Sequence, residues 1–284
     1  MTSLYQDIKD KLARLHVLEQ VIVINVVVFI VTGFFSLIFK GKSYIFDVLA
    51  LPNNAWEALY CPWTFISYGF LHQGLFHLFF NMLYLYVLTQ TFANLFKARM
   101  ALKIYILGIL FGALAFLSAA ALIPFLRIYD PLVGASAGVW ACIIFLCTYM
   151  PEKSIRVFMF NFKLKYLAFV LIAYNLIIVF SDNSGGGVAH YGGGILGYIY
   201  ARQLQKGKEF GLFLDKILDY FSSRKTLKTT YRRNTNKRTK SSKQEKSSFT
   251  HQKQIDLILD KIGKSGYESL SQEEKDFLFR AGKK

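Results

Sequence analysis

The feature that most constrains this chain is a series of long apolar segments, six of which follow one another between residues 17 and 204. A helix needs about 20 apolar residues to cross the hydrocarbon core of a bilayer, and its backbone polar groups must be hydrogen-bonded within the segment. The pattern therefore predicts an all-α polytopic membrane protein with six transmembrane helices. The predicted spans cover residues 17–39, 75–96, 104–126, 132–150, 164–180 and 188–204.

The distribution of basic residues predicts how these spans are oriented. Lys and Arg gather before the first span, between the second and third, and between the fourth and fifth, whereas the opposite connections are poor in them. Because cytoplasmic loops carry the excess of Lys and Arg, both termini are expected in the cytoplasm. The basic residues concerned are Lys9, Lys11, Arg14, Lys97, Arg99, Lys103, Lys153, Arg156 and Lys163.

Composition and charge agree with a membrane body that carries a polar tail. The chain is 54% hydrophobic, more than a soluble domain could bury in one core. Its net charge of +16 comes largely from the residues after Ala201, which include 21 Lys and Arg against 10 Asp and Glu. This tail lacks the interleaved aromatic residues of a nucleic-acid module, so no nucleic acid is expected and anionic membrane lipids are the favoured partner.

The N-terminal residues argue against a cleaved signal peptide, and the cysteines argue against a metal site or a disulfide framework. The first sixteen residues are polar and no cleavage site follows the first apolar segment, so that segment is expected to stay as a span and not to be removed as a signal peptide. The three cysteines, Cys61, Cys142 and Cys147, lack metal-ligand spacing. No metal, cofactor or disulfide framework is therefore expected.

Polar residues inside predicted spans are costly and indicate function by default. His77, Asn81, Ser136 and His190 all lie in the first two turns of the second, fourth and sixth spans, which run inward from the outer face. At a rise of about 1.5 Å per residue, they share a depth of roughly 3 to 10 Å. They are expected to meet in a water-filled notch below the outer face of the membrane.

These residue types are suited to acyl transfer. Ser136 is a weak nucleophile until a base such as a neutral His190 takes its proton. His77 and Asn81 lie one turn apart and could donate to the developing oxyanion, together with free backbone N–H groups at the start of the fourth span. Asp182 lies in the loop before the sixth span and is expected to face solvent, so a serine–histidine dyad is predicted.

Two further patterns surround these residues. Trp140 lies one turn after Ser136 and could stack on the imidazole of His190, although a lipid-facing or interior position is equally open. Small residues recur every fourth position in the sixth span and in the fourth, a spacing that lets two helix backbones approach closely. Spans four and six are therefore expected to touch through Ala189, Gly193, Gly197, Gly134 and Gly138.

Three motifs resemble those of the rhomboid family of intramembrane serine proteases. The segment GASAG from Gly134 to Gly138 is similar to the family's serine motif, AHYGGGILG from Ala189 to Gly197 to its histidine helix, and His77-x-x-x-Asn81 to its second-span motif. The resemblance extends over roughly residues 55–204. It implies a six-helix rhomboid-like bundle in which Ser136 is the nucleophile, His190 the general base, and His77 and Asn81 the oxyanion partners.

The resemblance also implies a class of substrate and a location for the protein. Substrates would be single-span or other transmembrane proteins whose helix can unwind near the outer face, and the location would be a bacterial inner membrane.

The sequence departs from the family pattern at two positions. Ala137 stands where the family usually has a glycine, and its methyl group could crowd the helix contact. Thr64 follows Trp63 where many members have arginine, which puts the behaviour of the outer loop in doubt.

The remaining residues divide the chain into five expected parts: a cytoplasmic segment 1–16, the catalytic domain 17–204, an amphipathic surface helix 205–223, a basic disordered linker 224–250 and a helical hairpin 251–284. In the hairpin, Gly263 is expected to end the first helix, and Ser271 with Glu274 forms a capping-box pattern before the second. The hairpin resembles a C-terminal region found on some bacterial rhomboid proteins.

Two rival functions stay open. A catalytically inactive rhomboid-like protein could bind and remodel membrane proteins, but such relatives typically lack the serine or the histidine, and both are present here. A transporter would show charged residues or broken helices near the bilayer centre in both halves of the chain. The main other polar candidates within spans are Asn25, Lys165 and Asn175, and no internal repeat is visible.

Overall fold

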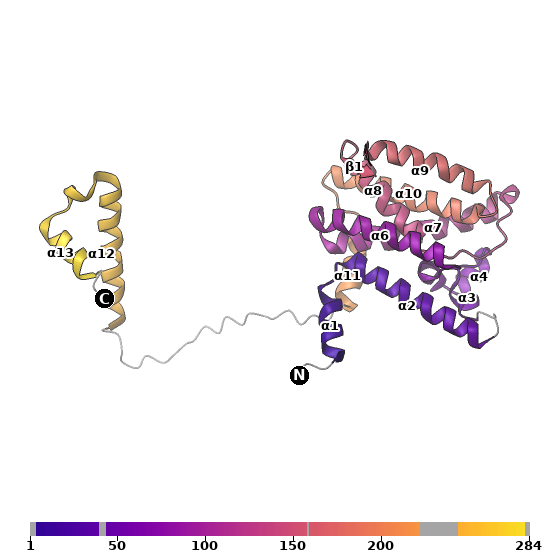
Figure 1. Cartoon of the computed structure of the whole chain (residues 1–284), viewed down its shortest axis with the longest axis horizontal. Helices are drawn as coiled ribbons and strands as arrows, with labels where there is room; N and C mark the ends of the chain where they lie inside the picture. The colour runs from indigo at the N-terminus through magenta and orange to yellow at the C-terminus, as the bar shows by residue number, and fades with distance from the viewer. Residues whose placement is uncertain (1–3, 40–43, 158, 222–243, 282–284) are drawn as a thin grey trace. The chain divides into compact units, whose positions relative to one another are not determined.

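The computed structural model describes residues 4–39, 44–157, 159–221 and 244–281. The chain divides into two compact units, Met1–Ser223 and Arg224–Lys284, which we describe separately. The first unit contains a bundle of helices (Figure 1). Its elements are α1 (Leu4–Arg14), α2 (Val17–Ile38), α3 (Tyr44–Leu49), α4 (Ala55–Tyr60), α5 (Thr64–Ser67), η1 (Tyr68–Phe70), α6 (Leu75–Leu95), α7 (Ala98–Leu122), η2 (Pro124–Leu126), α8 (Ser136–Tyr149), β1 (Ser154–Val157), β2 (Phe160–Lys163), α9 (Leu164–Val179), α10 (Ser184–Gln205) and α11 (Leu212–Phe221).

A helix occupies each of the six positions at which the sequence predicts a span. Helices α2, α6 and α9 agree with the prediction to within one residue at each end, whereas α7 begins at Ala98, α8 at Ser136 and α10 at Ser184. Among the described residues, α2, α6 and α7 are long and apolar enough to cross a membrane, and α8 and α9 are shorter apolar helices. The chain is thus an integral membrane protein, and the full count of six crossings stays a prediction.

The early start of α7 corrects the expected position of two basic residues. Arg99 and Lys103 were predicted in the loop before the third span, but both lie within α7. Lys103 is 1% exposed and its Nζ pairs with Glu209 at 2.5 Å and with Asp215 at 2.9 Å. A buried ammonium group needs such partners, which come from a segment that hydropathy alone does not connect to α7.

Helices α7, α8 and α10 form the centre of the bundle, as close backbone contacts show. A Cβ on Gly193 or on Gly197 of α10 would collide with the backbone of Ala137 or Ala141 of α8. The predicted contact between spans four and six is therefore confirmed. The prediction of which residues α8 contributes to this contact was wrong, because Gly138 faces Tyr105 of α7 and Gly134 precedes α8.

Helices α2 and α9 lie at the periphery and present apolar side chains outward. In Figure 1 they lie at opposite edges of the bundle. Phe34 on α2 is 60% exposed and Phe169 on α9 is 70% exposed. Exposed apolar surface of this extent is unfavourable in water, and it suits helices that contact lipid.

The described part of the long connection between α2 and α6 holds the segment that leads into α8. Leu51 pairs with Leu132 in an isolated antiparallel bridge. The side-chain amide of Asn53 donates to the carbonyl groups of Ile128 and Tyr129 at 3.0 and 2.9 Å. These bonds fix the approach of the chain to Ser136.

The connection between α8 and α9 is an antiparallel hairpin of β1 and β2, in which Ser154 pairs with Lys163. The sequence predicted only a basic loop here. Glu152 accepts from Lys163 at 2.8 Å and from Lys165 at 2.6 Å. The hydrogen bond from Lys163, followed by that from Lys165, lowers the pKa of Glu152 to about 2.

Helix α11 packs against the end of the bundle that carries Lys103. Its residue Leu214 is half-buried and packs against the main core, and Phe210, just before α11, meets Tyr200 edge-on at 6.1 Å between ring centroids. Asp219 pairs with Arg99 at 2.6 Å. Part of the apolar face that the sequence assigned to lipid therefore contacts protein.

The second unit is a helical hairpin made of α12 (Gln244–Ser265), η3 (Tyr267–Ser269) and α13 (Gln272–Ala281). Helix α12 begins within the range expected to be a disordered linker, 224–250, of which residues 224–243 lie outside the described residues. Gly263 does not end this helix. It continues to Ser265 and is followed by Gly266 at φ 77°, the left-handed conformation that glycine adopts most easily.

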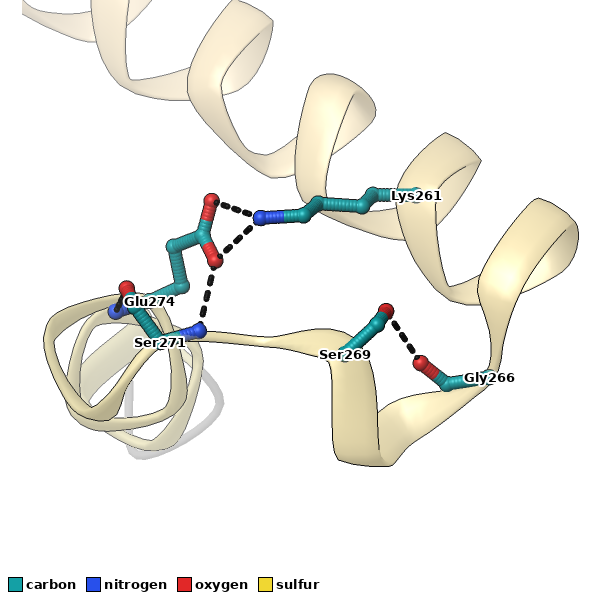
Figure 2. Close-up of polar contacts among 5 residues, drawn as sticks. All are labelled: Lys261, Gly266, Ser269, Ser271 and Glu274. Atoms are coloured by element: carbon teal, nitrogen blue, oxygen red, sulfur yellow. Dashed lines mark hydrogen bonds and ion pairs between the residues drawn. The ribbon is translucent and has the colours of Figure 1, made fainter.

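The predicted capping box of the second hairpin helix is confirmed. Glu274 accepts from the backbone N–H of Ser271 at 2.8 Å, and the N–H of Glu274 donates to the Ser271 hydroxyl at 3.3 Å. Figure 2 shows that the same carboxylate also accepts from Lys261 of α12, at 2.8 and 3.0 Å. One side chain thus caps α13 and joins it to α12.

Candidate functional site

A cavity of about 1110 Å³ in the first unit brings the predicted site residues together. They come from three helices, as predicted, and the cavity continues between residues of α6 and α9 such as Phe80 and Tyr174. The site residues that line the cavity are His77, Asn81, Ser136, Trp140 and His190.

The geometry of the Ser136 segment depends on Gly134. This residue has φ 125°, a conformation that other residues rarely adopt, and its N–H donates to the carbonyl of Tyr68 at 2.9 Å. Ser136 is then the first residue of α8. The first N–H groups of a helix have no partner within it and carry the positive end of its dipole, so Ser136 lies beside potential donors.

His77 occupies the space that Gly134 leaves free. A Cβ built on Gly134 would lie 2.8 Å from Nε2 and Cε1 of His77 and 3.7 Å from Oγ of Ser136. The edge of the His77 ring and the serine hydroxyl therefore flank the same small volume. Glycine is required here both for its backbone conformation and for the absence of a side chain.

Asn81 lies one turn beyond His77 on α6 and is 6% exposed. Its Nδ2 donates to the carbonyl of His77 at 2.9 Å. A side-chain amide has two N–H groups, so this bond orients the group and leaves one N–H for another acceptor.

The imidazole of His190 is held on its face and on its edge. The ring of Trp140 stacks on it with centroids 5.1 Å apart and planes inclined by 9°. Trp140 is 8% exposed, which contradicts the lipid-facing alternative. On the ring edge, Nδ1 of His190 lies 2.7 Å from Oδ1 of Asn175.

Asn175 is the site residue that sequence reasoning did not assign. It was noted only as one more polar residue within a span, yet the structure buries it completely and directs it at His190. A buried amide in an otherwise apolar helix is a general sign of function. Its partner could not be predicted, because the pairing depends on how α9 and α10 are rotated against each other.

Two ionisable groups near the site have no direct part in this arrangement. His72, in the outer loop, has its ring 5.0 Å from that of His77. Burial lowers the pKa of His72 to about 3, so this ring is neutral and adds no charge. Asp182 is exposed in the turn before α10, as expected. Over the described ranges, no three His, Cys, Asp or Glu side chains gather as metal ligands.

The packed apolar helices, the half-buried serine and histidine side chains and the buried amide groups define a polytopic helical membrane protein with a candidate site for acyl transfer. Residues 61–206 match the rhomboid domain, which covers more than half of the chain. The chain belongs to the rhomboid family, a family of intramembrane proteases that also has inactive members. Residues 239–284 match a family of unknown function, DUF6576. No curated protein matches the chain.

Proposed function

We propose that the protein is an intramembrane serine endopeptidase that uses Ser136 and His190 to cleave transmembrane segments of other membrane proteins near the outer face. The observation that carries this proposal is that both residues line one cavity with His77 and Asn81. In a bundle whose exposed surface is largely apolar, so many polar groups in one cavity would be costly without a function.

The reaction follows from the chemistry of these groups. Oγ of Ser136 attacks the carbonyl carbon of the scissile peptide bond while its proton passes to the free ring nitrogen of His190. The imidazolium then gives that proton to the leaving nitrogen as the C–N bond breaks. Water, deprotonated by the same imidazole, hydrolyses the acyl-enzyme and restores Ser136.

Stabilisation of the oxyanion is assigned to donors on two helices. The free N–H of Asn81, the ring of His77 and the backbone N–H groups at the start of α8 are the candidate donors, since Asn81 and His77 line the same cavity as Ser136. Preorganised donors of this kind are worth about 3 to 4 kcal/mol each in the transition state. No step needs a metal or a cofactor.

A transmembrane substrate must unwind to expose a peptide bond, because the carbonyl groups of an intact helix are hydrogen-bonded. The cavity walls formed by α6 and α9 favour entry between these two helices. Phe76 and Tyr174, which line the cavity, are 78% and 60% exposed. We assign the protein to a bacterial inner membrane, with both termini in the cytoplasm.

The proposal is tested in liposomes that contain the purified protein and a generic single-span substrate. We expect cleavage by the native chain and none by Ser136→Ala or His190→Ala, with thermal unfolding unchanged. Undiminished cleavage by Ser136→Ala would falsify the assignment. If the native chain cleaves nothing and a fluorophosphonate probe fails to label Ser136, the protein is instead an inactive rhomboid-like binding factor.

A further inference from the structure

Asn175 connects α9 to α10 through two hydrogen bonds made by one side chain. Its Oδ1 lies 2.7 Å from Nδ1 of His190, and its Nδ2 donates to the carbonyl of Gly187 at 2.8 Å. The side chain is 0% exposed. Both bonds reach α10, one turn apart, so the amide is held in one orientation.

The bond to Gly187 decides which amide atom faces the imidazole. A carbonyl oxygen only accepts hydrogen bonds, so the NH₂ group must point to Gly187 and the amide oxygen must point to His190. An amide oxygen is itself only an acceptor. Nδ1 of His190 must therefore carry a hydrogen and act as the donor.

This hydrogen-bond pattern fixes the tautomer of His190. In a neutral imidazole one nitrogen carries the proton and the other holds a lone pair. With the proton on Nδ1, the lone pair is on Nε2. We propose that Asn175 is a positioning residue that holds His190 in the Nδ1–H tautomer and thereby keeps Nε2 free to act as the base.

The stack of Trp140 on His190 makes the edge contact necessary. The Trp140 ring, whose centroid lies 5.1 Å from that of the imidazole, restrains the tilt of the imidazole plane. It does not decide how the imidazole is rotated within that plane. The hydrogen bond between Asn175 and one ring nitrogen fixes this rotation. Asn175 can also accept more strongly as the imidazole becomes an imidazolium, which assists proton transfer in the manner of the acid in a serine triad.

The first test measures the tautomer and does not depend on activity. Ring ¹⁵N NMR of the native protein, with His190 assigned by the signal that His190→Ala removes among the five histidines, should show protonated Nδ1 and unprotonated Nε2. In Asn175→Leu this preference should be lost. A native His190 protonated at Nε2 would overturn the proposal.

The second test measures the catalytic consequence, which rests on the proposed protease function. Asn175→Leu, which removes the acceptor at similar size, should lower kcat for a single-span substrate about 10- to 100-fold, the usual cost of losing a group that orients a functional histidine. KM should change less than about twofold, because Asn175 is not expected to contact substrate. Asn175→Asp keeps an acceptor toward Nδ1 and should recover at least half of the loss on a logarithmic scale.

The matched control is Asn25→Leu, which removes another fully buried amide from a helix whose residues do not line the cavity. This variant should retain the native kcat. If Asn175→Leu keeps the native kcat, or if Asn175→Asp is no better than Asn175→Leu while both stay folded, the positioning role is wrong. If the native chain is inactive but His190 carries its proton on Nδ1, the protease proposal fails and the tautomer assignment stands.

Discussion

At the scale of single residues, the site depends on glycines that leave space for neighbouring side chains. Gly134 leaves room for the His77 ring beside Ser136, and Gly112 of α7 leaves room for the methyl group of Ala137. The sequence raised the concern that Ala137 would crowd its helix contact. Instead its methyl group meets a glycine on α7, whereas its backbone is the part that contacts Gly193.

Gly134→Ala should damage the site specifically. The backbone conformation alone costs a non-glycine residue about 1–3 kcal/mol, and the new methyl group would lie 2.8 Å from the His77 ring. We expect cleavage to fall at least about tenfold and the melting temperature to drop. Gly33→Ala on α2 is the control, because it meets nothing within 4 Å and should leave cleavage intact.

Gly112→Ala should destabilise the centre of the bundle, since its Cβ would lie 2.5 Å from that of Ala137. Overpacking of this kind typically costs about 1–3 kcal/mol. Adding Ala137→Gly should recover part of the loss, with thermal unfolding in detergent as the measurement. Recovery cannot be complete, because Tyr68 Oη would still be 2.9 Å away. If the effects of the two substitutions on thermal stability simply add in the double variant, the contact between residues 112 and 137 is wrong.

At the scale of elements, α11 and the segment just before it are joined to α7 by charge pairs of unequal burial. Lys103 is almost fully buried between Glu209 and Asp215, whereas the Arg99–Asp219 pair is more than half exposed on both sides. Removing the buried Lys103 leaves Glu209 and the half-buried Asp215 side by side without their cation, whereas an exposed pair contributes little. The two cations, Lys103 and Arg99, can therefore be compared directly.

Lys103→Met should lower the free energy of unfolding by about 1–3 kcal/mol and increase protease access to the segment after α10. The same change at Arg99 should cost less than about 1 kcal/mol. Chemical unfolding in detergent and limited trypsin digestion measure the two effects. Equal losses for both variants would argue against a buried Lys103.

The capping box of α13 should make the hairpin sensitive to acid. The hydrogen bond from Lys261, followed by that from the N–H of Ser271, holds the pKa of Glu274 below its ordinary value of 4.5. A lowered pKa contributes stability above the unfolded value that is lost as the pH falls through the folded value. Pepsin cleavage within α13 should therefore be slow at pH 5 and accelerate as the pH drops below 4.5, the ordinary value. Glu274→Gln should be cleaved faster than the native chain at pH 5 and show a weaker dependence on pH.

At the scale of the whole molecule, the prediction is the orientation of the chain in its membrane. Cys61 is partly exposed in the outer loop, and Cys142 and Cys147 are buried. An impermeant maleimide applied to intact cells should label Cys61. In a Cys61→Ser background, Ser265→Cys in the hairpin should react only after permeabilisation. The reverse pattern would overturn the assignment of both termini to the cytoplasm.

The sequence by itself determined the membrane class, the approximate positions of six helices and the four polar residues that line one cavity. These properties follow from length, hydropathy and helical periodicity, which are local. The capping box of Ser271 and Glu274 was also predictable because its partners are three residues apart. The helix ends at Ala98 and Ser265 were missed, since apolar content and single glycines mark helix boundaries only loosely.

Only the tertiary structure decided which groups meet across helices. The partners of Lys103 are more than 100 residues away, and Asn175 reaches His190 only because α9 and α10 are packed in one rotation about their axes. The side on which Ala137 presents its methyl group was settled in the same way. Such pairings depend on the relative rotation of neighbouring helices, which arises from the packing of the whole bundle and leaves no local pattern in the sequence.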